Sequence, residues 1–329
     1  MRFGLVYDFR NPAAWRKPWP EVYAGLLDQI ALADDLGYDS IWLTEHHFVE
    51  DGYTPSPVPL MAAIAARTRR VQISTDILIL PLYHPVKLAE DIATIDVISN
   101  GRAMLGVGSG YRDEEFAAFG TSRKERASRM EEGVAILRGC WSEGPFTFRG
   151  RHHQIDAIDV VPKPVQKPHP PLWMAATAEP AARRAARLGL HLLPQADRVG
   201  GYDAWVDELR KLGRSPADYR VGLIKSWFVT DHGRDDPLWS VVRERERYRG
   251  GTYAPWLTAG YVRPGAGAVP IDQGYMIGSP TELITQIDAL TKALPATDII
   301  GWATPPGMDP ADFNPRIERF ARDVMPHFR

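Results

Sequence analysis

The regular alternation of short apolar runs with amphipathic segments is the strongest constraint on how this 329-residue chain folds. Segments such as 21–36 and 85–98 repeat their apolar residues at helical spacing, which predicts helices. Between the helical segments lie apolar runs that are short enough to be buried strands, at residues 2–8, 39–43, 71–80, 103–107, 172–176, 191–194, 220–229 and 298–302. Such alternation predicts an α/β fold with a parallel sheet. Eight units in a chain of this length favour a closed (β/α)8 TIM barrel over an open sheet.

Composition restricts the class of protein further. The chain is 44% hydrophobic and 24% charged with a formal net charge of -2, which argues against a nucleic-acid or membrane-surface role. The lone Cys140 cannot form an intramolecular disulfide, and a reducing cytoplasm fits this. The chain starts directly with a strand pattern, so no signal peptide is expected. We predict one cytoplasmic domain over residues 1–329.

Two segments depart from the alternation and are expected as insertions at the C-terminal face of the barrel. Residues 146–155 have the pattern of a small hairpin or an extended excursion. Residues 250–275 are rich in Gly and Pro, carry several aromatic residues and show no clear period. Long loops of this kind in compact domains are usually lids or disordered segments. We predict a mobile lid over 250–275, with an ordered insertion against a partner subunit as the alternative.

A histidine pair follows the second predicted strand, in the run Ile-Trp-Leu-Thr-Glu-His-His-Phe at residues 41–48. The C-terminal ends of barrel strands carry the chemistry, and imidazole is well suited to proton transfer near neutral pH. A metal site is disfavoured, because neighbouring strand residues point to opposite faces and residues 2–8 contain no His. We therefore expect His46 to transfer protons or contact a cofactor, and a packed structural histidine is the alternative.

Three further strand ends carry residues that suit a ligand. His84 follows the third strand, just before a Pro that opens a helix. The glycine-rich run at 106–110 leaves backbone N–H groups free for an anion, although Tyr111 stands where a dinucleotide motif has its third glycine. Thr177 and Ala178 precede another predicted helix, whose N-terminus is a natural phosphate seat. The strand ends therefore favour a phosphorylated cofactor with a reactive ring, with tight turns as the alternative, but spacing does not name the cofactor.

Taken together, several motifs resemble the bacterial luciferase-like monooxygenases. They cover nearly the whole chain in order, at residues 36–48, 80–86, 90–91, 99–102, 106–110, 116–120, 277–280 and 323–326. The resemblance implies a (β/α)8 barrel that binds FMN or, in some branches, the deazaflavin F420. The FMN branch takes reduced flavin from a separate flavin reductase and forms a C4a-peroxyflavin with O2. It also implies a homodimer, and the composition predicts no nucleic-acid or membrane partner.

The resemblance favours FMN, because Glu-His-His is similar to the luciferase side of the family. The predicted function is a two-component FMN monooxygenase acting on a small hydrophobic substrate. The first alternative is F420-dependent hydride transfer without O2. The second alternative is a flavin-binding protein without turnover.

The resemblance also assigns roles to individual residues. It implies that His46 and His84 are active-site histidines, that His47 is a structural neighbour, and that a non-prolyl cis peptide lies under the flavin at Asp76–Ile77. The residues implied to lie near the flavin phosphate are Gly108, Ser109, Tyr111, Arg129, Thr177 and Ala178.

Three positions depart from the luciferase pattern. Ser109 stands where luciferase carries Arg, and Ala178 stands where it carries Ser, so one charge and one hydroxyl for the phosphate are absent. These changes imply weaker flavin retention or a different cofactor. Gly108 replaces the reactive cysteine of luciferase, so light emission is not implied.

Overall fold

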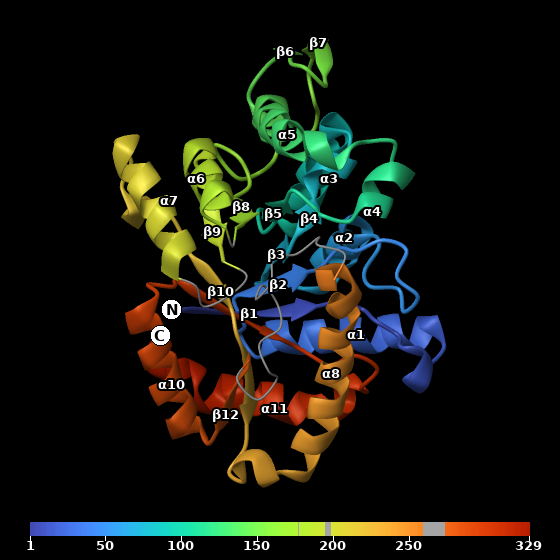
Figure 1. Ribbon diagram of the computed structural model, residues 1–329, viewed down its shortest axis with the longest axis vertical. Coiled ribbons are helices and arrows are strands. Elements are labelled where there is room, and N and C mark those ends of the chain that lie inside the picture. Colours follow the sequence, from blue (N-terminus) through green and yellow to red (C-terminus); the bar gives the residue numbers. More distant parts are fainter. Residues whose placement is uncertain (177, 195–198, 259–273) are drawn as a thin grey trace.

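The computed structural model describes residues 1–176, 178–194, 199–258 and 274–329. Parallel pairing joins the strands into two larger sheets, with the orders β10-β13-β1-β2-β3 and β4-β5-β8-β9 (Figure 1). Their strands are β1 (Arg2–Tyr7), β2 (Ser40–Leu43), β3 (Gln72–Thr75), β4 (Leu78–Ile79), β5 (Leu105–Gly108), β8 (Leu172–Ala175), β9 (His191–Leu193), β10 (Gly222–Ile224) and β13 (Asp298–Trp302). Two smaller sheets pair β6 (Phe146–Arg149) with β7 (Gln154–Ile158), and β11 (Ser226–Val229) with β12 (Tyr275–Gly278).

Isolated parallel bridges join the two larger sheets at both ends. Ile73 of β3 pairs with Ala103, just before β5, and Leu192 of β9 pairs with Val221, just before β10. Pairing therefore continues around a ring of parallel strands, as predicted for a (β/α)8 barrel.

Helices surround this ring (Figure 1). They are α1 (Trp19–Asp35), α2 (Pro57–Arg67), α3 (Pro85–Ser99), α4 (Asp113–Ala118), α5 (Arg126–Trp141), α6 (Glu179–Leu188), α7 (Val199–Lys211), α8 (Pro237–Thr258), α10 (Pro280–Ala293) and α11 (Pro310–Asp323). Local sequence explains several helix ends. Asn100 ends α3 in the left-handed conformation at φ 54°, and Ser279 and Glu282 form a capping box that starts α10.

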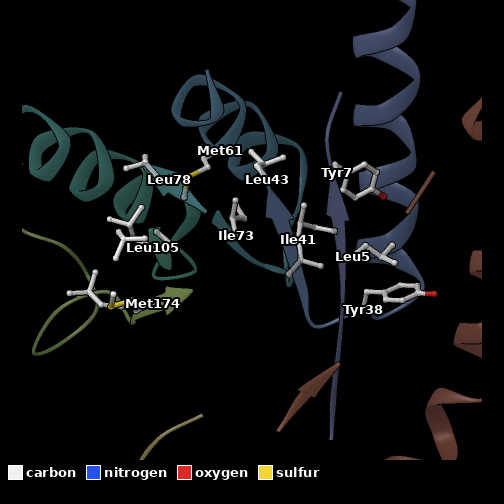
Figure 2. Close-up of a cluster of buried hydrophobic side chains, with 14 of the residues drawn as sticks. Leu5, Tyr7, Tyr38, Ile41, Leu43, Met61, Ile73, Leu78, Leu105 and Met174 are labelled. Atoms are coloured by element: carbon white, nitrogen blue, oxygen red, sulfur yellow. The ribbon is translucent and has the colours of Figure 1, made fainter. Parts of the chain in front are cut away.

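The period-two alternation of the strands produces two separate apolar cores. Outward-facing side chains such as Leu5, Ile41 and Leu105 pack between the strands and the helices, as Figure 2 shows. Inward-facing side chains form a second core of Val6, Trp42, Met104, Trp173, Leu193 and Ile300. The ring centroids of Trp42 on β2 and Trp173 on β8 lie 5.3 Å apart, although these strands are not neighbours. This contact across the interior is expected of a filled barrel.

The structure corrects four predicted boundaries. The predicted strand 71–80 divides into β3 and β4 around a cis peptide, and the predicted strand 220–229 divides into β10 and β11. β12 was missed, because only Met276 and Ile277 interrupt a glycine-rich stretch. Residues 250–258 continue helix α8, so the prediction of a loop is wrong for this part of the lid. Residues 259–273 of the predicted lid lie outside the described residues. The predicted hairpin is confirmed as antiparallel β6–β7.

In the described ranges, every helix is too short or too polar to cross a membrane.

Candidate active site

His46 lies just beyond the end of β2, buried, with both ring nitrogens in contact with polar groups. Its backbone N–H donates to the Tyr53 carbonyl at 3.1 Å, which fixes the turn after the strand. Its Nδ1 lies 3.2 Å from Glu115 Oε1, and its Nε2 lies 3.2 Å from the Tyr111 hydroxyl. An ionised carboxylate only accepts hydrogen bonds, so we assign the hydrogen of neutral His46 to Nδ1. Nε2 is then the atom that can accept a proton.

Glu115, on α4, orients this histidine. Its Oε1 accepts from His46, from the His47 backbone N–H at 3.0 Å and from Arg112 Nη1 at 3.1 Å. Burial by itself raises the pKa of Glu115, but the hydrogen bond and charge of His46, the His47 N–H and Arg112 outweigh burial and lower it. Glu115 is therefore an ionised carboxylate in a buried site. Glu115 cannot be recognised from sequence alone, since a Glu in the first turn of a helix is typical of any helix start.

Aromatic rings surround His46 and form what we call the aromatic cage: Tyr53, Tyr111, Tyr253 and Trp256. Their ring centroids lie 4.9, 5.6, 6.0 and 4.8 Å from the His46 ring, in that order. Tyr253 and Trp256 come from the C-terminal part of α8, which reaches the strand ends here (Figure 1). Burial raises the pKa of Tyr111 and Tyr253, so both phenols stay neutral.

His47 has the supporting position that was predicted. Its Nε2 lies 3.2 Å from Oε1 of the buried Glu45, which also accepts from the Ile79 N–H and the Tyr83 hydroxyl. The His47 ring packs against Phe119, with centroids 4.7 Å apart. Glu45 therefore ties the end of β2 to β4.

Asp76 and Ile77, which were predicted to lie under the flavin, lie between the end of β3 and the start of β4 and pack against Gly108 at the end of β5. The Asp76–Ile77 peptide is cis, at the position that the resemblance implied. The buried Asp76 donates its N–H to the Leu43 carbonyl at 2.7 Å. A Cβ on Gly108 would lie 2.2 Å from Ile77 Cδ1, so only glycine fits there without movement. Asp76, Ile77 and Gly108 therefore pack closely together, and we call these three residues the cradle. Gly108 contributes no side chain to it.

The structure separates the predicted phosphate residues. Arg129 lies on α5 and Ala178 at the start of α6, whereas the Tyr111 hydroxyl lies 3.2 Å from His46 Nε2 in the aromatic cage. The half-buried Ser109 follows β5, and Ala178 precedes the first turn of α6. Arg129 Nε on α5 pairs with Glu125 at 3.2 Å, so part of its charge is neutralised. Thr177 lies outside the described residues.

Arg126, which was not among the predicted site residues, is less neutralised than Arg129. It makes no ion pair with any carboxylate of the described residues, whereas Arg129 does. Burial lowers the pKa of Arg126, and the charges of Arg123 and Arg184 lower it further. Positive charge is therefore concentrated where α5 begins, which suits an anion.

His84 lies apart from this arrangement. It is exposed at the start of α3, and its ring packs against His153 of the β6–β7 hairpin, with centroids 5.9 Å apart. The structure therefore does not bring His84 together with His46 as the resemblance implied. Within the described ranges, no group of three or more His, Cys, Asp or Glu side chains is arranged to hold a metal ion.

Proteins of one known family match most of this chain. Residues 1–297 match the family model described as luciferase-like monooxygenase. Over 178 residues the chain is 30% identical to the oxygenase component of flavin-dependent trigonelline monooxygenase from Acinetobacter baylyi, covering 54% of this chain and 49% of that protein. It is 33% identical over 171 residues to the F420-dependent glucose-6-phosphate dehydrogenase of Amycolatopsis mediterranei, covering 50% and 51%.

The match to solved structures extends further along the chain. The monooxygenase RslO1 from Streptomyces bottropensis superposes with a TM-score of 0.86 at 26% identity, covering 100% of both chains. By contrast, the chain spans about half the length of the curated relatives it matches.

Proposed function

Because the chain belongs to the luciferase-like monooxygenase family, whose members are flavin-dependent oxidoreductases, we propose that it is the oxygenase component of a two-component FMN monooxygenase. In this proposal it takes reduced FMN from a separate flavin reductase and uses O2 to oxidise an organic substrate. The observation that carries the proposal is the buried His46–Glu115 pair inside the aromatic cage, next to the cradle at Asp76–Ile77. The proposal includes a cytoplasmic homodimer.

The residues present fit a flavin mononucleotide. The close-packed cradle of Asp76, Ile77 and Gly108 would support the planar ring system. Arg126 and Arg129, with Ser109, Thr177 and Ala178, would hold the phosphate. Their charges would compensate for the arginine that is absent at Ser109. Bound in this way, reduced FMN would supply the two electrons that O2 activation requires.

His46 would hold and release a proton at Nε2, with the Tyr111 hydroxyl as its neighbour. Glu115 would keep the ring in place through Nδ1 and stabilise the imidazolium when it forms. The aromatic cage would exclude water from this proton, which limits unproductive loss of oxidising equivalents as hydrogen peroxide. His84 would act at the rim of the site and not beside His46.

F420-dependent hydride transfer without O2 is the second candidate, and the 33% identity to an F420-dependent dehydrogenase favours it. The two functions differ in their cofactor and in their need for O2. Titration of the protein with FMN, reduced FMN and F420, followed by O2 uptake, separates them. A monooxygenase is expected to bind reduced FMN and to show a delay between O2 consumption and the return of oxidised-flavin absorbance.

The same titration tests the phosphate residues. Arg126→Gln is expected to weaken FMN binding at least tenfold and more than Arg129→Gln, because Arg129 is already paired with Glu125. Preferential binding of F420 with no O2 uptake would overturn the FMN proposal. Tight flavin binding without any effect on O2 consumption would instead support a non-catalytic flavin-binding protein.

A further inference from the structure

Arg112 connects the end of helix α8 to the carboxylate that holds His46. It is buried and lies immediately before the first residue of α4. Its Nη1 donates to the His47 carbonyl at 2.7 Å and to Glu115 Oε1 at 3.1 Å. Its guanidinium carbon lies 4.5 Å from the centroid of the Trp256 ring, which is near enough for a cation–π interaction. These contacts fix the charge of Arg112 beside the histidine.

One carboxylate oxygen serves both Arg112 and His46. Glu115 Oε1 accepts from Arg112 Nη1 and lies 3.2 Å from His46 Nδ1, whereas Glu115 Oε2 is buried without a hydrogen-bond partner among the described residues. Glu114 also pairs with the guanidinium, but its side chain is 44% exposed, so water screens its charge. If His46 gains a proton at Nε2, two buried cations share one buried anion. Buried charges are weakly screened, so the guanidinium opposes the imidazolium.

The other titratable groups in contact with the His46 side chain are three phenols of the aromatic cage: Tyr53, Tyr111 and Tyr253. Burial raises the pKa of each phenol, so all three stay neutral. Two pairs of polar side chains nearby are already engaged with each other: Arg10 with Asp51 at 2.6 Å, and His47 with Glu45 at 3.2 Å. Among the described groups at this site, Glu115 and Arg112 therefore carry the charges that act on His46.

We propose that Arg112 is a positioning residue that keeps His46 neutral, and that Trp256 makes this effect depend on the packing of helix α8. A neutral His46 has Nε2 free to accept a proton, which is the role that the proposed function gives it. The Trp256 ring contacts both partners, because its centroid also lies 4.8 Å from that of the His46 ring. The inference rests on the proposed function only for the use of this proton. The charge balance itself follows from the contacts of Arg112.

The test is the pH titration of His46 in the full chain, followed by NMR of histidine labelled with ¹³C at Cε1 and assigned with His46→Gln. We expect Arg112→Gln to raise the titration midpoint of His46 by about one pH unit or more, a tenfold gain in proton affinity, because it removes the opposing charge. Arg112→Lys keeps the charge and should restore most of the original behaviour. Glu114→Gln is the matched control, because it removes only the exposed partner of the same guanidinium.

A double-mutant cycle tests the part assigned to Trp256. Trp256→Leu also removes a ring from His46 itself, so the single substitution does not isolate the contact with Arg112. If Trp256 holds Arg112 in place, the rise caused by Arg112→Gln should shrink by about half a pH unit or more, roughly threefold in proton affinity, in the Trp256→Leu background. Equal rises in both backgrounds would refute the dependence on α8.

An unchanged or lowered midpoint of His46 in Arg112→Gln overturns the inference. An equal rise in Arg112→Lys also overturns it, because loss of packing alone predicts that result. His327, exposed in the last turn of the chain, is the internal reference and should titrate alike in every variant. If thermal unfolding shows that Arg112→Gln does not fold, Arg112→Met provides the second neutral variant. The titration needs neither flavin nor O2, so its failure is distinguishable from failure of the proposed function.

Discussion

Glu115→Gln isolates the charge of the carboxylate that holds His46. All three hydrogen bonds that we describe at Glu115 end on Oε1, while Oε2 is buried without a partner. Gln can keep its carbonyl oxygen at the Oε1 position and place its amide at the Oε2 position. The substitution therefore preserves the three acceptor contacts and removes the negative charge.

The expected magnitude follows from those contacts. A hydrogen bond to a charged group contributes about 1.5–3 kcal/mol and a neutral one about 0.5–1.5, so losing the charge beside Arg112 costs about 1 kcal/mol or more. The unpartnered amide adds a similar cost. We expect the free energy of unfolding to fall by about 2–4 kcal/mol. Weaker support for a charged His46 should slow O2-dependent flavin turnover about 10- to 100-fold, equivalent to about 1.4–2.8 kcal/mol.

Urea unfolding and stopped-flow mixing of the reduced-FMN complex with O2 measure the two effects. Glu114→Gln is the matched control, because Glu114 also pairs with Arg112 but its side chain is 44% exposed. Exposed pairs contribute about 0–1 kcal/mol, so this control should be nearly silent. Equal effects of the two substitutions, or normal flavin turnover in Glu115→Gln, would refute the role assigned to the buried carboxylate.

Three further substitutions test other parts of the molecule. Burial lowers the pKa of His191 to about 4, so the stability it contributes is complete above its ordinary pKa of 6.5 and is lost as pH falls toward 4; His191→Asn should remove roughly 3 kcal/mol of this pH dependence in urea unfolding. Gly108→Ala should lower the free energy of unfolding by about 1–3 kcal/mol and weaken FMN binding, because the new Cβ would meet Ile77 at 2.2 Å. Gly250→Ala is the control: its Cβ would meet nothing within 4 Å, so the Tm should stay unchanged or rise. Arg102→Lys should cost about 2–4 kcal/mol by calorimetry, since the two terminal nitrogens of Arg102 donate to three backbone carbonyls that one ammonium cannot reach together.

The barrel was predictable because short, continuous apolar runs alternate with segments that repeat their apolar residues at helical spacing. The interior core, with Trp42 against Trp173, could not be predicted, since each strand shows only that it is apolar and not which strand it faces. The extension of α8 past residue 250 was missed for a related reason. Two adjacent glycines weaken the helical pattern, and packing of Tyr253 and Trp256 against His46 compensates for this.

The candidate site was predictable only where chemistry follows a strand end. His46 was found in this way, and the cis bond at Asp76–Ile77 came from the resemblance. Glu115 is 69 residues away from His46 in sequence, and nothing in its own surroundings distinguishes it from a solvated helix residue. The buried ion pairs of Arg10 with Asp51 and of Arg249 with Asp8 were missed because the partners are far apart in the chain and meet only in the folded structure.

Helix α8 supplies Arg249, Thr252, Tyr253 and Trp256 to the mouth of the barrel from a single stretch of eight residues. The strands provide the fixed chemical groups, whereas this helix provides much of the wall that a substrate would meet. Under the proposed function, the part of the protein that would contact a substrate is therefore separate in sequence from the part that would react. We expect that exchanging Tyr253 and Trp256 between members of the family would alter substrate preference, while Arg249 keeps its buried ion pair with Asp8 at the end of β1.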